Sequence, residues 1–179
     1  EFLAPPTGSL PAPEIRFLCG LDEEEFTRRI ILFDTGIARP ATRGLNVVLD
    51  AYLTRDSKRY AAIRESLEIH DRMVEALSQG DYRSLGSHAD RYWALRCILD
   101  PDATNDGIRH LFEAPALREV LEGGLLTGAG GGGFAILVAA DNGDQELRKR
   151  LHHLRRQKAF ASSRVVDFRL SRAGICRHE

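Results

Sequence analysis

The sequence has few cysteines, almost no excess charge of either sign and no long hydrophobic run. Cys19, Cys97 and Cys176 stand far apart and lack the short spacings of zinc sites and redox dithiols. We therefore expect free thiols in a reducing cytoplasm. A formal net charge of -1 provides no overall field for nucleic acid or an anionic membrane, so we predict neither as a partner.

Targeting and membrane-spanning signals are also missing. The opening residues 1–6 lack a basic stretch followed by a long apolar one, and no apolar run reaches the length that crosses a membrane. The abrupt start at Glu1-Phe2 is what a cloning scar or a truncation would leave. Four of the seven prolines fall within residues 1–25, which predicts an extended lead-in there and a folded domain over residues 26–179.

What the sequence does contain is enough apolar side chain for one substantial core, since 43% of its residues are hydrophobic. Apolar runs predict strands at 29–33, 125–127 and 134–139, and an alternating strand at 164–170. Helices are expected from about residue 40 to 53, in a hairpin broken at Gly80-Asp81, in short pieces through 112 and 121, and at 144–158. This order predicts an α+β fold with a mostly antiparallel sheet, helices on one face and an inserted helical hairpin.

The expected contact face of the hairpin follows from helical spacing. Its predicted stripes are Ile63, Leu67, Val74 and Leu77 on the first helix, and Leu85, Tyr92, Leu95 and Leu99 on the second. His70 and His88 fall within these stripes and could approach each other as a metal pair. Because neither stripe places a carboxylate beside them, packing or capping roles are favoured.

A glycine-rich run between two predicted strands is the most informative segment. Glycine admits backbone angles that side chains forbid, so main-chain N–H groups can be presented to an anion; a loose hairpin turn is the alternative. A dinucleotide fingerprint would have to open a helix, and the motifs that accompany a protein-kinase glycine loop are missing. We predict a phosphate-side loop, with Gly130→Val costing little stability. Its residues are Thr127, Gly128, Ala129, Gly130, Gly131, Gly132 and Gly133.

The sequence from Leu125 to Phe134 resembles the third motif of the GHMP-superfamily kinases, K-L-T/A-G-A-G-G-G-G-hydrophobic, with Leu125 where lysine is common. Residues 31–41 resemble the L-V-Y-T-G-x-x-R-x-A segment of fucokinases and heptose-phosphate kinases, with Asp34 in place of tyrosine. Residues 93–105 are similar to the fucokinase pattern W-x-L-x-x-x-L-D-P-x-x-T-N, and residues 166–174 to the fucokinase C-terminal strand and glycine. Fucokinases are therefore the preferred relatives.

This resemblance implies a ferredoxin-like C-terminal half of an ATP-dependent sugar-1-kinase. Such an enzyme would transfer the ATP γ-phosphoryl group to the anomeric hydroxyl of L-fucose with Mg²⁺. The implied partners are the N-terminal kinase half, which carries the nucleotide loop and catalytic aspartate, together with sugar and ATP. We expect no catalytic residue or metal ligand in this half, and no activity from the isolated chain. Alternatives are a heptose-phosphate kinase half and a non-catalytic ligand-binding or interaction module of the same fold.

Polar residues after the first predicted strand can be aimed at a pocket by the turn that follows it. We assign these residues to the sugar side, namely Asp34, Thr35, Gly36 and Arg39. Trp93, which resembles the fucokinase tryptophan, is assigned to the same side. The Asp34-Thr35-Gly36 triplet also matches the aspartic-protease D-T-G, but such a protein would be almost wholly β, and residues 40–121 are predicted helical.

Residues 148–158 hold six basic side chains and no acidic one. We predict that these residues form a solvated helix face; the alternative is a surface that binds phosphate or a partner.

Overall fold

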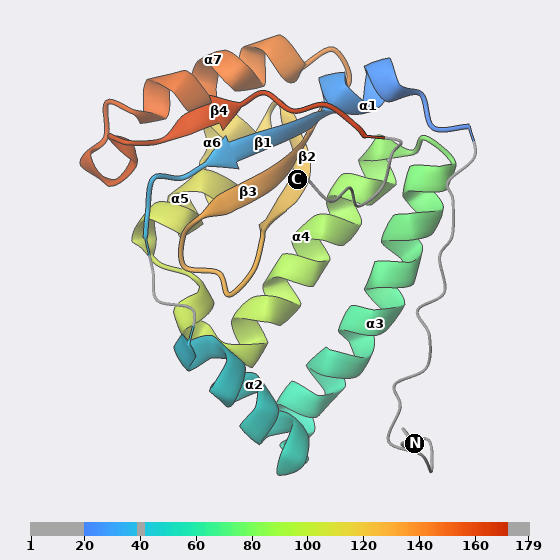
Figure 1. The fold of residues 1–179 in the computed structure, drawn as a ribbon, viewed down its shortest axis with the longest axis vertical. Coiled ribbons are helices and arrows are strands. Elements are labelled where there is room, and N and C mark those ends of the chain that lie inside the picture. The colour runs from blue at the N-terminus through green and yellow to red at the C-terminus, as the bar shows by residue number, and fades with distance from the viewer. Residues whose placement is uncertain (1–19, 39–41, 172–179) are drawn as a thin grey trace, which may run out of the picture.

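The computed structural model describes residues 20–38 and 42–171 (Figure 1). Its helices are α1 (Glu23–Arg29), α2 (Thr42–Leu53), α3 (Ser57–Ser78), α4 (Tyr82–Leu99), α5 (Asp106–Glu113), α6 (Pro115–Arg118) and α7 (Asp144–Leu154), with 3-10 turns at Pro101–Ala103 and Lys158–Phe160. Its strands are β1 (Ile30–Asp34), β2 (Leu121–Leu126), β3 (Phe134–Ala139) and β4 (Arg164–Val166). Most of the predicted lead-in lies outside the described residues, and α1 begins three residues before the predicted start of the folded domain. None of the described helices is both long enough and apolar enough to cross a bilayer.

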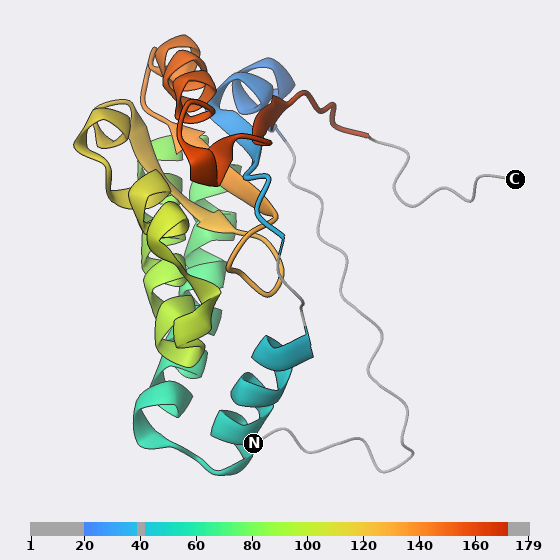
Figure 2. The ribbon, with the colours of Figure 1, turned by 90° about the vertical axis from the view of Figure 1, so that its left-hand side faces the viewer.

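The four strands form one antiparallel sheet in the order β2-β3-β1-β4, which confirms the predicted α+β architecture. Side chains alternate along the central strands. Ile31 and Leu137 face a core shared with α5, α6 and α7, whereas Ile30 and Val138 face the turn of the hairpin, where α3 ends and α4 begins. Helices α5, α6 and α7 therefore cover one face and the hairpin packs against the other. The far end of the hairpin extends beyond the sheet (Figures 1 and 2).

The contact face of α3 differs from the predicted stripe. The helix buries Ala62, Ile69 and Ala76, seven residues apart, while Leu67 is 59% exposed. Small alanines let the backbone of α4 approach closely, and an analysis that weights large apolar residues passes over them. The remaining predicted residues, Ile63, Val74 and Leu77, lie half-buried at the edge of the interface.

The hairpin residue His70 is exposed to solvent and does not pack in the helix interface as expected. The His70 side chain is 66% exposed and its Nδ1 lies 3.5 Å from Asp71 Oδ1. Within residues 20–38 and 42–171, no group of three or more His, Cys, Asp or Glu side chains is arranged to hold a metal ion.

Helix α4 covers the outer strand β2 by an unusually close approach. A Cβ on Gly123 would lie 1.9 Å from the carbonyl oxygen of Gly86, so both positions need glycine. One turn further along α4, Asp90 Oδ1 accepts a 2.8 Å hydrogen bond from the Gly124 amide. These glycines also explain why the sequence predicted only the end of β2, which begins at Leu121 rather than Leu125.

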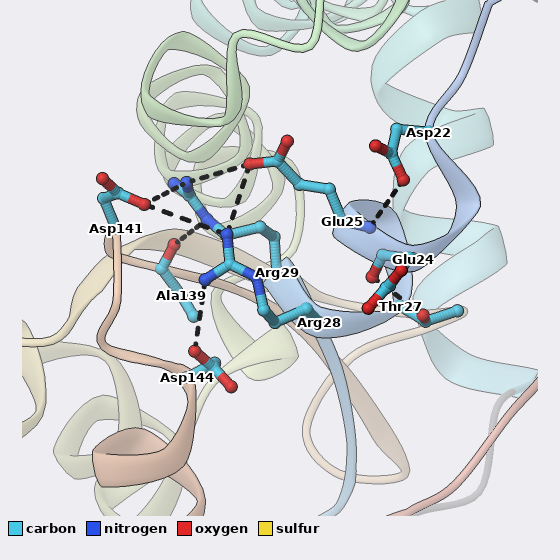
Figure 3. Close-up of polar contacts among 9 residues, drawn as sticks. All are labelled: Asp22, Glu24, Glu25, Thr27, Arg28, Arg29, Ala139, Asp141 and Asp144. Carbon is cyan, nitrogen blue, oxygen red and sulfur yellow. Dashed lines mark hydrogen bonds and ion pairs between the residues drawn. The ribbon is translucent and has the colours of Figure 1, made fainter.

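A cluster of charged side chains fastens α1 to the far end of the sheet (Figure 3). The buried Arg29 donates from Nε to the Ala139 carbonyl at 2.9 Å, and its guanidinium lies 4.9 Å from the centre of the Tyr82 ring. Arg29 Nη1 lies 3.4 Å from Asp141, and Arg28 Nη1 lies 3.4 Å from Asp144. Because this cluster joins α1, α4 and the β3–α7 turn, it holds the helical hairpin against the sheet.

The C-terminal part is less regular than the sequence predicted. Helix α7 ends at Leu154 and a 3-10 turn follows at Lys158–Phe160. Strand β4 pairs with β1 only from Arg164 to Val166. Beyond it, strand pairing stops and Phe168 packs edge-on against Phe26, with ring centroids 6.2 Å apart. That contact, rather than a longer β ladder, places this part of the chain.

Candidate functional site

The glycine run is a tight connection between the antiparallel strands β2 and β3, as the sequence predicts. The Thr127 amide donates to the Phe134 carbonyl at 2.8 Å and closes the hairpin. Four of the glycines have positive φ angles, namely Gly128 (65°), Gly130 (79°), Gly131 (73°) and Gly133 (78°). A chain with side chains at these positions would be strained, so the shape of the loop depends directly on its composition.

The end of β1 holds one side of this loop. The carbonyl oxygen of Gly133 accepts two hydrogen bonds from Thr35, from the amide at 2.9 Å and from the hydroxyl at 2.8 Å. The Gly133 amide donates in turn to the Ile37 carbonyl at 2.9 Å. A Cβ on Gly132 would lie only 2.2 Å from that carbonyl oxygen. The structure therefore brings together two segments that the sequence singled out separately.

The segment after α4 holds the other side. The Gly131 amide donates to the Ala103 carbonyl, and a Cβ on Gly130 would lie 2.8 Å from the Ala103 Cβ. Asn105 Nδ2 donates to the Gly131 carbonyl at 2.8 Å, while its Oδ1 accepts from the Ile108 amide and caps α5. Gly130→Val would therefore clash with Ala103, so the sequence-based prediction of little stability loss is wrong.

The loop has a closed side and an open side. Gly130, Gly131 and Gly132 are buried, whereas Gly128 and Gly133 are exposed and a Cβ on either would meet no atom within 4 Å. Among the described contacts, the amides of Gly128, Ala129 and Gly132 donate no hydrogen bond. A rigid loop with unused N–H groups and free space beside it can bind an anion through its backbone.

The predicted sugar-side residues after β1 form several contacts within the protein. Thr35 is fully buried, and besides donating to Gly133 its hydroxyl accepts from the Ile37 amide at 3.3 Å. Asp34 accepts from the Gly36 amide at 3.0 Å and lies 3.4 Å from Arg164. Gly36 has a φ of 68° and backs onto Ser162. These three residues shape a turn, and Arg39 lies outside the described residues.

Trp93 is placed apart from the loop. Its ring is buried and tilted against Phe112 at a centroid distance of 5.5 Å. Both rings line a hollow of about 660 Å³ between α4, α5 and α6, together with Asp90, Ala94, Cys97, Thr104, Arg109, Glu113 and Arg118. Burial raises the pKa of the Cys97 thiol there. The segment 101–105 separates this hollow from the glycine loop, so the sugar contact of Trp93 stays a prediction.

Two residues that brace the loop were not assigned to it from the sequence. In the sequence, Asn105 belonged only to the segment 93–105 that resembles fucokinases, and its side-chain amide was the available signal. Arg96, one helical turn after Trp93, reaches the loop with its Nη2 3.4 Å from the Ala129 carbonyl. Neither partner could be inferred from local pattern, because each contact spans more than 25 residues.

Comparison with known proteins finds a curated relative in sequence and several solved structures of similar fold, while no protein-family model matches. Over 128 residues, 71% of this chain, the sequence is 34% identical to the bifunctional fucokinase/GDP-fucose pyrophosphorylase of Arabidopsis thaliana. The chain spans only 12% of that protein's length. L. major mevalonate kinase, solved with R-mevalonate, superimposes with a TM-score of 0.62 at 19% identity, covering 76% of this chain and 40% of the other. At that identity the likeness concerns the fold alone.

Proposed function

We propose that this segment of a GHMP-superfamily sugar kinase supplies the phosphate-side loop of an L-fucokinase active site. The observation that carries the proposal is the loop itself. Thr35 and Asn105 hold it through the carbonyls of Gly133 and Gly131, and the amides of the exposed Gly128 and the half-buried Ala129 donate no hydrogen bond among the described contacts. Catalysis of phosphoryl transfer rests on positioning and on stabilising charge, so donors that need no rearrangement lower the barrier most.

The rest of the catalytic apparatus is assigned to the N-terminal half of the kinase. The complete enzyme would bind ATP and Mg²⁺, and the catalytic aspartate would orient the sugar hydroxyl. This chain would contribute the loop amides and a wall of the sugar pocket. It would be inactive alone, because half of a cleft cannot position two reactants. We place the enzyme in the cytoplasm.

On the sugar side, we propose a division of roles. Thr35 and Gly36 position the glycine loop, since the Thr35 hydroxyl is already occupied by backbone partners. Asp34 holds the turn, and Arg39 is the residue proposed to contact sugar. Trp93 would contact the sugar through the hollow on the other side of residues 101–105.

Two observations favour L-fucose as the substrate. The sequence is 34% identical to the plant fucokinase/pyrophosphorylase, and residues 93–105 resemble the fucokinase pattern. A heptose-phosphate kinase half shares the loop and the segment after β1, and a non-catalytic module would retain the fold alone.

The test combines this chain with an N-terminal kinase half, fused or as a separate chain, and measures ATP-dependent phosphorylation of L-fucose, D-galactose and a heptose phosphate. We expect turnover with L-fucose and none from the 179 residues alone. Preference for the heptose phosphate would reassign the substrate. A reassembled protein that phosphorylates no sugar would favour the non-catalytic module.

A matched pair of variants separates the loop's function from its folding. Gly128→Val and Gly80→Val both place a side chain at a positive φ, 65° and 68°, with no atom within 4 Å. Each should cost about 1–2 kcal/mol of stability. Only Gly128→Val would obstruct the open side of the loop, so it alone should abolish turnover. Equal activity in the two variants would remove the loop from the mechanism.

A further inference from the structure

Helix α7 and the edge strand β4 enclose a second polar hollow, of about 370 Å³, away from the glycine loop. It is lined by Arg148, Leu151, His152, Arg155, Arg164, Val165 and Asp167. A neighbouring hollow of about 300 Å³ shares His152 and Arg155 and adds His153, Arg156 and Ala161. The two hollows form one basic surface at the end of α7, which lies beside β4 in Figure 1.

The positive charge of this surface is poorly neutralised. Arg148 lies 4.0 Å from Asp167, whose carboxylate is fully exposed, and Arg164 lies 3.4 Å from Asp34. Within the described residues, Arg155 and Arg156 have no ion pair. Three arginines therefore line the larger hollow against one lining carboxylate.

The other side of α7 shows that this arrangement is not general to the helix. Arg150 is held by two carboxylates, Glu146 at 2.9 Å and Glu119 at 2.7 Å. In contrast, Arg148, His152 and Arg155 follow each other at spacings of four and three residues, so they share one helix face. On this face, Arg148 has only the exposed Asp167 at 4.0 Å, and Arg155 has no ion pair among the described residues.

The walls of the hollow are rigid. Leu147, Leu151 and Leu154 are buried in the main core and hold α7 in place. Arg164 belongs to β4, which pairs with β1. Guanidinium groups carried on such fixed elements can form the forked hydrogen bonds that match phosphate oxygens.

We propose that this hollow binds the phosphate or diphosphate group of a small molecule, at a site separate from the glycine loop. The chemistry is shared by inorganic phosphate, a sugar phosphate and a nucleoside diphosphate. Because Arg164 also pairs with Asp34, an anion that recruits Arg164 would compete with an ion pair beside the 34–37 turn. The site would thereby be linked to the segment that holds the glycine loop.

The test follows the arginine side-chain and histidine NMR signals of the 179-residue chain during titration at constant ionic strength. The ligands are inorganic phosphate, pyrophosphate, a sugar 1-phosphate and a nucleoside diphosphate, with sodium chloride as the reference. We expect saturable shifts with at least one phosphate compound, and the compound with the lowest Kd identifies the source. Arg148→Gln and Arg155→Gln should each raise Kd about tenfold.

Arg83→Gln is the matched control, because Arg83 is exposed on α4 and has no ion pair among the described residues. It removes the same charge and should leave Kd unchanged. Chloride producing the same shifts, or Arg83→Gln weakening binding as much as Arg155→Gln, would overturn the proposal in favour of diffuse charge. An acidic peptide that binds through Arg155 while no phosphate compound does would also overturn it. This readout needs no kinase activity and is independent of the proposed function.

Discussion

Thr35 and Gly133 are joined by two hydrogen bonds to one carbonyl oxygen, at 2.8 Å from the hydroxyl and 2.9 Å from the amide. The residues are 98 positions apart, and this contact fixes the end of β1 to the end of the glycine loop. The threonine hydroxyl also accepts from the Ile37 amide, so one buried side chain bonds to two backbone groups.

Replacing Thr35 with valine should therefore lower the free energy of unfolding by about 1–3 kcal/mol, since buried polar groups would lose their partner. Thr127→Val makes the same change at an exposed residue, whose hydroxyl lies 3.2 Å from the Phe134 carbonyl. Urea denaturation of both variants measures the difference. Similar losses of unfolding free energy at the two positions would show that the buried Thr35 contact stabilises the protein no more than the exposed Thr127 contact.

Asn105 allows the helix cap and the loop contact to be separated. Asn105→Asp keeps the acceptor for the Ile108 amide but turns the donor facing the Gly131 carbonyl into an acceptor. We expect α5 to stay capped while the amide of Gly131 exchanges faster with solvent. Asn105→Ala should lose both contacts and at least the roughly 0.5–2 kcal/mol of a lost cap. Unchanged exchange at Gly131 in the aspartate variant would contradict the bracing role.

The approach of α4 to β2 predicts a severe effect of adding one methyl group. Gly123→Ala would place its Cβ 1.9 Å from the Gly86 carbonyl oxygen, so strand and helix must separate. We expect a loss of about 3 kcal/mol or more in thermal or urea unfolding. Gly80→Ala has open space around it and should cost about 1–2 kcal/mol from its positive φ alone. A loss at Gly123 no larger than that would show that the two elements can move apart cheaply.

The pH dependence of the α3/α4 hairpin should depend on Glu65 and Arg91, which are joined by two hydrogen bonds of 2.7 and 2.8 Å. The hydrogen bond from Arg91 is the main cause that lowers the pKa of Glu65 below its ordinary 4.5. Stability from this pair is therefore complete above pH 4.5 and is lost as the pH falls through the lowered folded-state pKa.

An NMR titration of the Glu65 carboxyl carbon tests this prediction. Arg91→Gln should return the pKa towards its ordinary value, and Arg72→Gln should move it less, since Arg72 contributes only through its more distant charge. The stability difference between the wild type and Arg91→Gln should persist above pH 4.5 and vanish in acid. A difference that grows on acidification would have the wrong sign for this ion pair.

The type and order of most elements could be predicted from the sequence, because periodicity and glycine or proline breaks are local properties. The strand 134–139 agrees with β3 to the residue, and the hairpin break falls at Gly80-Asp81. The glycine run between apolar strands also predicted a strand-to-strand connection. The apolar run from Phe134 to Val138 is typical of a strand, so a helix was not expected to begin there.

The contacts between these elements could not be predicted from local sequence pattern. The alanine face of α3, the early start of β2 and the second role of Asn105 depend on which distant backbone lies opposite each residue. The same holds for α7, where Arg150 finds Glu119 across the fold while Arg155 on another face finds no carboxylate among the described residues. Local pattern specifies which residues can be buried, but it contains no information on the partner 30 or 100 residues away. Close packing of the whole chain selects these long-range partners. A single added Cβ at Gly123 or Gly132 would be enough to prevent the contacts observed there.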